Sequence, residues 1–156
     1  MKLNLKYYPQ HKDYSCGPVC LRMVFEHLGR RYSEAKLISL CQTSVKNGTT
    51  HNHLLDEIKR EGFEYLVKSR GAIKDIIHFV ELGHLIIVNY IEPLSKESHY
   101  AVVSGYDKKE KVIILADPCD GNDFTLGWGE FKKMWHNKNN SSKGWLLVVG
   151  REFIVE

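Results

Sequence analysis

The chain lacks a long hydrophobic run. Its most apolar stretch, residues 85–91, has the length of a strand and is far too short to cross a membrane. The residues after Met1 alternate lysine with leucine and asparagine, and they contain no apolar signal core. Nothing here indicates an oxidising compartment, so we expect the four cysteines to be reduced. We therefore predict a cytoplasmic protein that does not insert into a membrane.

The sequence also lacks an excess of one charge. It carries 22 Lys and Arg against 19 Asp and Glu, a net charge of +3, and no block of basic residues. This gives little support to a nucleic-acid partner, and we expect none. No Cys-x-x-Cys motif is present, and Cys16 with Cys20 would supply only two of the ligands that a metal site needs. We therefore expect no metal and no cofactor.

No repeat, low-complexity tract or linker interrupts the 156 residues, so we predict one domain over residues 1–156. Helical spacing predominates in the first half and strand patterns in the second. The expected helices are 16–28, one after a Ser33 cap, one from a Thr50 cap to Gly62, 73–80 ending at Gly83, and 128–136. The expected strands are 63–68, 85–91, 100–106, 112–115, and 145–149, which closes the sheet. This order favours an α+β fold, with N-terminal helices packed on a C-terminal antiparallel sheet.

Cys16 has a position suited to chemistry. It precedes Gly17 and Pro18 at the predicted start of the first helix. The free N–H groups and the positive end of a helix favour an anion there. The thiolate is the reactive form of a cysteine, and a helix N-terminus is one of the environments that stabilises it. Cys16 is therefore a candidate nucleophile, which needs a base.

Three further residues can complete such a site. His99 opens a predicted strand, which would fix its imidazole as a base. Asp117 follows the next strand, and a hairpin between the two strands would bring its carboxylate beside His99 to hold the ring. Gln10 lies six residues before Cys16, and its amide could donate to an oxyanion together with the Cys16 backbone N–H. The other cysteines and histidines have simpler interpretations: Cys20 is predicted to be core, and His51 and His53 to lie on a solvated helix start.

Taken in order, these motifs resemble the C39 family of papain-like cysteine peptidases. The resemblance runs from about residue 8 to 145 and is carried by the following motifs: Gln10 with Cys16-Gly17-Pro18, Gly48-Thr49-Thr50, Gly62-Phe63, His99-Tyr100, Gly105-Tyr106-Asp107 and Asp117-Pro118. In that family the cysteine, histidine and aspartate are catalytic and the glutamine forms the oxyanion hole, which implies the roles of Cys16, His99, Asp117 and Gln10 here.

The resemblance implies a papain-like fold and a thiol hydrolase that cuts a peptide or isopeptide bond through an acyl-enzyme. Many members are domains of exporters that cut leader peptides after a Gly-Gly pair, so a peptide or protein substrate and a separate exporter are the implied partners. Two alternatives stay open. One is an acyltransferase or transpeptidase that uses the same thioester, and the other is a non-catalytic module that only binds peptides.

Overall fold

Residues 1–152 are described by a computed structural model. The last four residues of the predicted domain, 153–156, lie outside the described part. In chain order the elements are α1 (Cys16–His27), α2 (Glu34–Leu40), α3 (His51–Arg60), β1 (Glu64–Lys68), α4 (Ile73–Glu81), β2 (Ile86–Ile91), β3 (Ser98–Asp107), β4 (Val112–Asp117), β5 (Gly121–Gly127), α5 (Trp128–Met134) and β6 (Leu146–Gly150). Five helices with one antiparallel sheet, within residues 1–152, confirm the α+β prediction.

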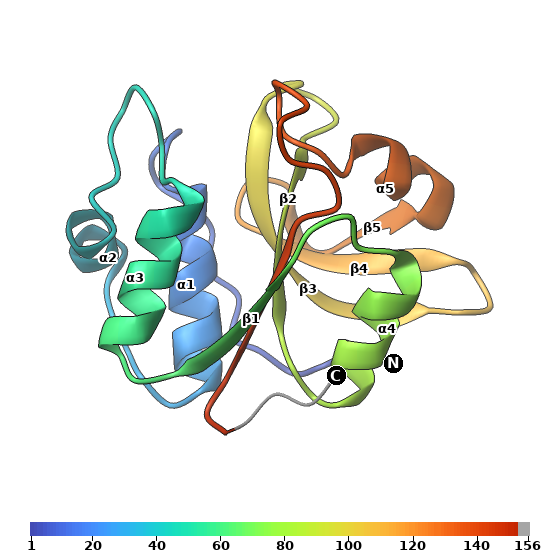
Figure 1. The fold of residues 1–156 in the computed structure, drawn as a ribbon, viewed down its shortest axis with the longest axis horizontal. Helices are drawn as coiled ribbons and strands as arrows, with labels where there is room; N and C mark the ends of the chain where they lie inside the picture. Colours follow the sequence, from blue (N-terminus) through green and yellow to red (C-terminus); the bar gives the residue numbers. More distant parts are fainter. Residues whose placement is uncertain (153–156) are drawn as a thin grey trace.

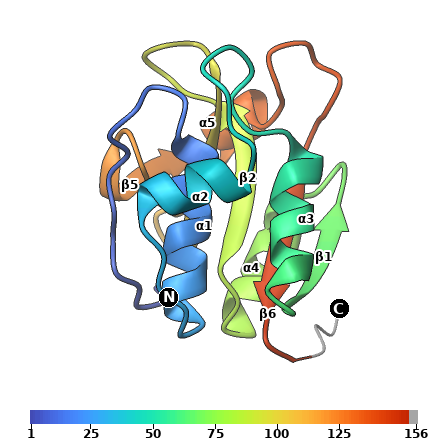
Figure 2. The same cartoon turned by 90° about the vertical axis from the view of Figure 1, so that its left-hand side faces the viewer.

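The sheet has the strand order β1-β6-β2-β3-β4-β5 and is covered by helices on both faces (Figures 1 and 2). Side chains alternate between the two faces along each strand. On β2, for example, Ile87 packs in the core beneath α1, α2 and α3, whereas Ile86 and Val88 pack in the core beneath α4 and α5. Because both faces are buried, this strand is an apolar run interrupted only by Asn89 and does not alternate between apolar and polar residues.

The helix boundaries follow the predicted capping residues. The Ser33 hydroxyl accepts from the Lys36 N–H at 3.1 Å, and the Thr50 hydroxyl accepts from the His53 N–H at 3.1 Å. Gly62 and Gly83 follow the ends of α3 and α4 with φ angles of 78° and 89°, a region that favours glycine. The predicted hairpin is also confirmed, since β3 and β4 pair through a turn at residues 108–111.

Two features of the sheet differ from the prediction. Strand β5 is not predicted, because residues 121–127 have exposed or half-buried side chains at most positions and lack an apolar run. Strand β6 does not close the sheet at an edge but lies between β1 and β2, pairing antiparallel with both. Its five residues are all buried, which is the pattern of an interior strand. Within residues 1–152, no helix has the length and hydropathy needed to span a membrane.

Candidate active site

Cys16 is the first residue of α1, and Ser15 occupies its N-cap position. The Cys16 side chain is partly exposed, whereas the residues that follow it from Gly17 to Leu21 are buried against the sheet. Helix α1 packs on β3, the strand that carries His99. The thiol therefore lies where the N-terminus of a buried helix meets the sheet.

His99 and Asp117 are brought together by the hairpin of β3 and β4. The register pairs Val102 with Ala116, which puts the residues at the ends of the two strands side by side. His99 Nε2 lies 2.7 Å from Asp117 Oδ1, and the Asp117 side chain is fully buried. This ring nitrogen is therefore engaged by a carboxylate, and Nδ1 is left for another partner.

Further donors hold the Asp117 carboxylate. Its Oδ1 also accepts from the backbone N–H groups of Cys119 at 2.9 Å and Asp120 at 3.0 Å. Its Oδ2 accepts from the buried hydroxyl of Tyr90 at 2.5 Å. Burial acts to raise the pKa of Asp117, but the bond and charge of His99 and the other hydrogen bonds lower it below its ordinary value. The carboxylate is thus ionised and fixed in place.

The pKa of His99 depends on both of its neighbours, Asp117 and Cys16. Burial acts to lower its pKa, but hydrogen bonds to Asp117 and Cys16, and the negative charges of both, raise the pKa well above its ordinary value. A protonated imidazole between a thiolate and a carboxylate is the arrangement that such a shift favours. Cys16 and His99 line the same cavity, and His99 is bound to Asp117, so the three side chains that the sequence predicts to act together lie close to one another.

Gln10 lies at the same place, in the segment that leads to α1. Its backbone N–H donates to the Pro118 carbonyl at 3.0 Å, which ties the segment to the residue after Asp117. Its side-chain Nε2 donates to the Lys12 carbonyl at 2.8 Å, and this uses one of the two hydrogens on that nitrogen. Among the described residues its Oε1 is buried without a partner. The Gln10 amide lines the same cavity as Cys16 and His99.

Glu34 anchors the segment between Gln10 and Cys16, a role that no motif of the sequence predicts. Its carboxylate accepts from the Ser15 hydroxyl at 2.6 Å, from the His11 backbone N–H at 2.9 Å and from the His11 ring at 2.6 Å. Burial raises the pKa of Glu34, but these hydrogen bonds outweigh it and the pKa is lowered. The first residue of α2 thereby fixes the residue before Cys16.

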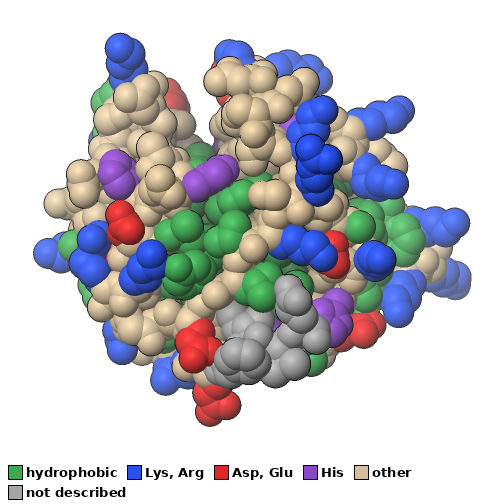
Figure 3. Space-filling view, viewed as in Figure 1, with side chains coloured by type: hydrophobic (Ala, Val, Ile, Leu, Met, Phe, Trp, Pro, Cys, Tyr) green, Lys and Arg blue, Asp and Glu red, His purple; other side chains and the backbone are tan. Residues whose placement is uncertain are grey.

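Two cavities flank Cys16. The first, here called the His99 cavity, has a volume of about 290 Å³ and is lined by Gln10, Asp13, Cys16, Glu92, Ser95, Glu97, Ser98, His99 and Cys119. The second, the His51 cavity, has a volume of about 260 Å³ and is lined by Cys16, Asn47, Gly48, Thr49, Thr50, His51, Asn89, Ser98, Tyr100 and Asn137. Figure 3 shows the surface hollowed between the helical part of the molecule and the sheet. An extended chain lying across Cys16 would enter both cavities.

The prediction that His51 lies on a solvated helix start is wrong. Its ring stacks on Trp145, with centroids 3.9 Å apart and planes at 10°, and its Nδ1 lies 2.5 Å from the Tyr100 hydroxyl. Burial lowers the pKa of His51 to about 4, so the ring is neutral at physiological pH. His51 is a wall of the cavity beside Cys16, and only its contacts with distant residues reveal this.

Glu92 and Asp120 form a carboxyl pair beside the triad. Burial, followed by the charges of Asp117 and Glu92, raises the pKa of Asp120 to about 6. For Glu92, burial acts in the same direction, but bonds from the N–H groups of Leu94 and Ser95 and from Asp120 lower its pKa. Asp120 therefore holds its proton to a higher pH than an ordinary aspartate does.

The remaining cysteines differ from Cys16. Cys20 is fully buried in the core, as predicted, and burial raises the pKa of its thiol. Burial also raises the pKa of Cys41, to about 12. Cys119 is exposed and lines the His99 cavity, and its pKa is raised by burial and by Asp120. Of the four, only Cys16 is among the groups that raise the pKa of His99.

Comparison with known proteins identifies the family of this chain. The model of the peptidase C39 family matches residues 4–139. An uncharacterized protein of Methanothermobacter thermautotrophicus is 32% identical over 112 residues, which are 72% of this chain and 70% of that protein. A second one, from Methanothermobacter marburgensis, is 35% identical over 112 residues, with the same coverage of 72% and 70%.

Solved structures show the same fold. The peptidase domain of Streptococcus ComA, described as a bifunctional ABC transporter of a quorum-sensing pathway, has a TM-score of 0.77 at 25% identity and covers 96% of this chain and 100% of that one. A putative C39-like peptidase from Bacillus anthracis has a TM-score of 0.74 at 15% identity, covering 99% and 100%. A double glycine motif protease from an AMS/PCAT transporter, solved with its leader peptide, has a TM-score of 0.73 at 18% identity, covering 97% and 94%.

The chain belongs to the peptidase C39 family. Its fold is that of the C39 peptidase domains, with five helices on a six-stranded sheet in the described part.

Proposed function

We propose that this protein is a cysteine peptidase in which Cys16 is the nucleophile, His99 the general base and acid, and Asp117 the residue that orients the imidazole. The observation that carries this proposal is that His99, held at 2.7 Å by the buried Asp117 carboxylate, lines the same cavity as Cys16 at the N-terminus of α1. An unreactive core cysteine would not need an imidazole held at 2.7 Å by a carboxylate with three further donors.

In the proposed reaction the Cys16 thiolate attacks the carbonyl carbon of a peptide bond. The oxyanion that forms accepts from the backbone N–H of Cys16 and from the Nε2 hydrogen of Gln10 that Lys12 leaves free. The C–N bond breaks as the His99 imidazolium gives its proton to the leaving amine. Water, deprotonated by His99, then attacks the thioester and releases the acid together with the free thiol.

The proposed reaction indicates which part of the substrate occupies each of the two cavities. Because His99 protonates the leaving amine, the segment C-terminal to the cut lies over the His99 cavity. The segment on the acyl side then enters the His51 cavity, whose wall at Gly48, Thr49 and Thr50 is made of small side chains. Such a wall suits a backbone with small side chains, so we propose a leader peptide cut after a Gly-Gly pair as the substrate. A separate exporter is the partner that would move the processed peptide.

The proposal is tested by alkylation with limiting iodoacetamide at about pH 6, where an unactivated thiol is almost wholly protonated. Peptide mapping should find Cys16 modified first. Cys119 is the internal control, because it is exposed but lacks a paired imidazole. The His99→Ala variant should lose the preference for Cys16, while Cys119→Ser should keep it. Preferential modification of Cys119 in the folded protein, or unchanged Cys16 labelling in His99→Ala, contradicts the assignment.

A further inference from the structure

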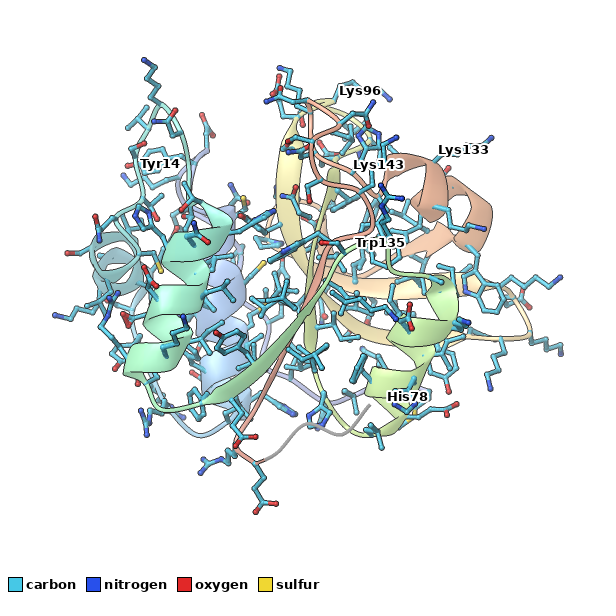
Figure 4. The ribbon with its side chains drawn as sticks, in the orientation of Figure 1. Tyr14, His78, Lys96, Lys133, Trp135 and Lys143 are labelled. Carbon is cyan, nitrogen blue, oxygen red and sulfur yellow. The ribbon has the colours of Figure 1, made fainter. Side chains whose placement is uncertain are left out.

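A third cavity lies outside the site described above and is larger than either of the cavities beside Cys16, at about 520 Å³. It is lined by Arg70, Gly71, Lys132, Lys133, Trp135, His136, Asn140, Lys143 and Gly144. This basic cavity contains four permanent cations and no carboxylate. Figure 4 shows Lys133, Trp135 and Lys143 grouped at α5 and the loop before β6, and Figure 3 shows Lys and Arg side chains gathered over that region.

The cations of the basic cavity lack protein partners. None of Arg70, Lys132, Lys133 or Lys143 forms an ion pair or a side-chain hydrogen bond with any residue of the range 1–152. The contrast with Lys138 on the same loop is direct, because its ammonium lies 2.7 Å from the Glu97 carboxylate. Like charges held together without a counter-charge repel one another, and an anion from outside would relieve that repulsion.

The backbone holds these cations together through an unusual local structure. Arg70 and Asn140 have φ angles of 54° and 56°, a region that side chains other than glycine rarely adopt. The N–H groups of Arg70 and Gly71 donate to the carbonyls of Lys143 and Gly144, both at 2.8 Å. A Cβ atom on Gly144 would lie 2.6 Å from the Gly71 nitrogen, so this approach requires glycine. The two loops are thus locked in an arrangement that sets Arg70 beside Lys143.

The basic cavity adjoins the proposed acyl-side cavity. Consecutive residues divide the two, since His136 lines the basic cavity and Asn137 lines the His51 cavity. An aromatic connection runs beneath them: the Trp135 indole donates to the Trp145 carbonyl at 2.9 Å, and the Trp145 ring stacks on His51. A peptide that leaves the His51 cavity past Asn137 therefore meets the basic cavity next.

We infer that the basic cavity binds acidic side chains of the peptide substrate, at positions N-terminal to the scissile bond and upstream of those in the His51 cavity. The inference rests on the proposed function for the direction of the bound chain, and it adds a substrate class: a leader with clustered Asp or Glu before the cleavage site. The occupant is a peptide because the cavity continues the path of the substrate, and it is acidic because four unpaired cations face it.

The test measures binding without catalysis. A fluorescein-labelled oligoglutamate peptide is titrated with the Cys16→Ser protein by fluorescence anisotropy, against an oligoglutamine peptide of the same length. The glutamate peptide should bind and the glutamine peptide should not. A charge-reversed variant, Lys132→Glu with Lys143→Glu, should weaken binding about tenfold or more, and added salt should weaken it too. The matched control is Lys108→Glu with Lys109→Glu, which reverses two charges on the β3–β4 turn and should leave binding unchanged.

Three outcomes overturn the inference: no binding of oligoglutamate, equal loss in the control variant, or tighter binding of tripolyphosphate than of the peptide at equal charge, which would indicate a small-anion site. The outcome does not depend on peptidase activity, since the protein carries serine at position 16. Failure of the catalytic proposal would show instead in the alkylation experiment. If both proposals hold, glutamates placed upstream of Gly-Gly in a synthetic substrate should lower KM and leave kcat unchanged.

Discussion

Replacing Asp117 by alanine or by asparagine separates its structural role from its charge. Besides the His99 ring, the alanine variant leaves three donors without an acceptor: the Tyr90 hydroxyl and the N–H groups of Cys119 and Asp120. Tyr90 is fully buried, so water cannot replace the lost acceptor at its hydroxyl. At about 1–2 kcal/mol for each orphaned donor, Asp117→Ala should lose about 3–6 kcal/mol of unfolding free energy.

Asparagine should be tolerated much better. Its Oδ1 can accept from His99 and from the two backbone N–H groups, and its amide nitrogen can donate to Tyr90 once that hydroxyl turns round. Only the extra strength of bonds to a charged acceptor is lost, about 1–2 kcal/mol in total. For a chain of this size the melting temperature should fall by about 10–18 °C in Asp117→Ala and by about 3–6 °C in Asp117→Asn.

The assay is thermal unfolding followed by circular dichroism, with kcat/KM on a cleavable peptide measured well below both transitions. Both variants should be slower than the wild type, because the imidazolium loses its carboxylate, and asparagine should retain more activity because it still holds the ring. If Asp117→Ala melts within a few degrees of Asp117→Asn, the donors around Asp117 do not depend on it and the reasoning is refuted. Full activity in Asp117→Ala would remove Asp117 from the site.

Four further predictions follow from the same contacts. Gln10→Ala should lower kcat roughly 10²–10³-fold with little change in KM, and a change in KM alone would make Gln10 a substrate-positioning residue. Glu34→Ala should lower kcat by a larger factor than it lowers the rate of Cys16 alkylation. The reason is that it frees the segment that carries Gln10 but leaves the contacts of His99. Equal effects on kcat and on the alkylation rate would argue against this role of Glu34. Because the pKa of His99 is raised in the folded state, its protonation stabilises the fold fully below about pH 6.5. This contribution is lost as the pH rises through the folded-state pKa. The difference in unfolding free energy between wild type and His99→Ala should therefore change over that pH range. The pKa of Asp120 is raised to about 6, so the folded state loses stability as the pH rises from about 4 to 6. The Asp120→Asn variant should therefore have a higher melting temperature than the wild type at about pH 7.5 but not at about pH 4. A higher melting temperature at both pH values would refute the pairing of Asp120 with Glu92.

Local signals in the sequence predict most of the elements. The caps at Ser33 and Thr50 and the glycines at 62 and 83 place helix ends correctly, since each acts through hydrogen bonds or φ angles within a few residues. The hairpin also follows from local pattern, and it is what brings His99 to Asp117. Strand β5 has no such signal, because an edge strand with exposed side chains needs no apolar run.

Interactions between distant residues explain what the sequence did not reveal. His51 belongs to the cavity wall because Trp145, the residue before the strand inserted between β1 and β2, stacks on it. Tyr90 and Glu34 fix the proposed triad and the Gln10 segment from elements that no spacing rule connects to them. The residues that we propose to react could be selected from type and order, but those that hold them in place could not.

The insertion of β6 has a consequence for how this protein is made. Strands β1 and β2 emerge from the ribosome early, yet the edges on which they pair with β6 have no partner until residues 146–150 have been made. Until then both present unpaired edges, which favour association with other chains. Trp145, the residue before β6, also supplies the surface on which His51 stacks. The cleft is therefore completed only after residues 145–150 have been made, so until then the growing chain carries Cys16, the proposed nucleophile, without a finished site.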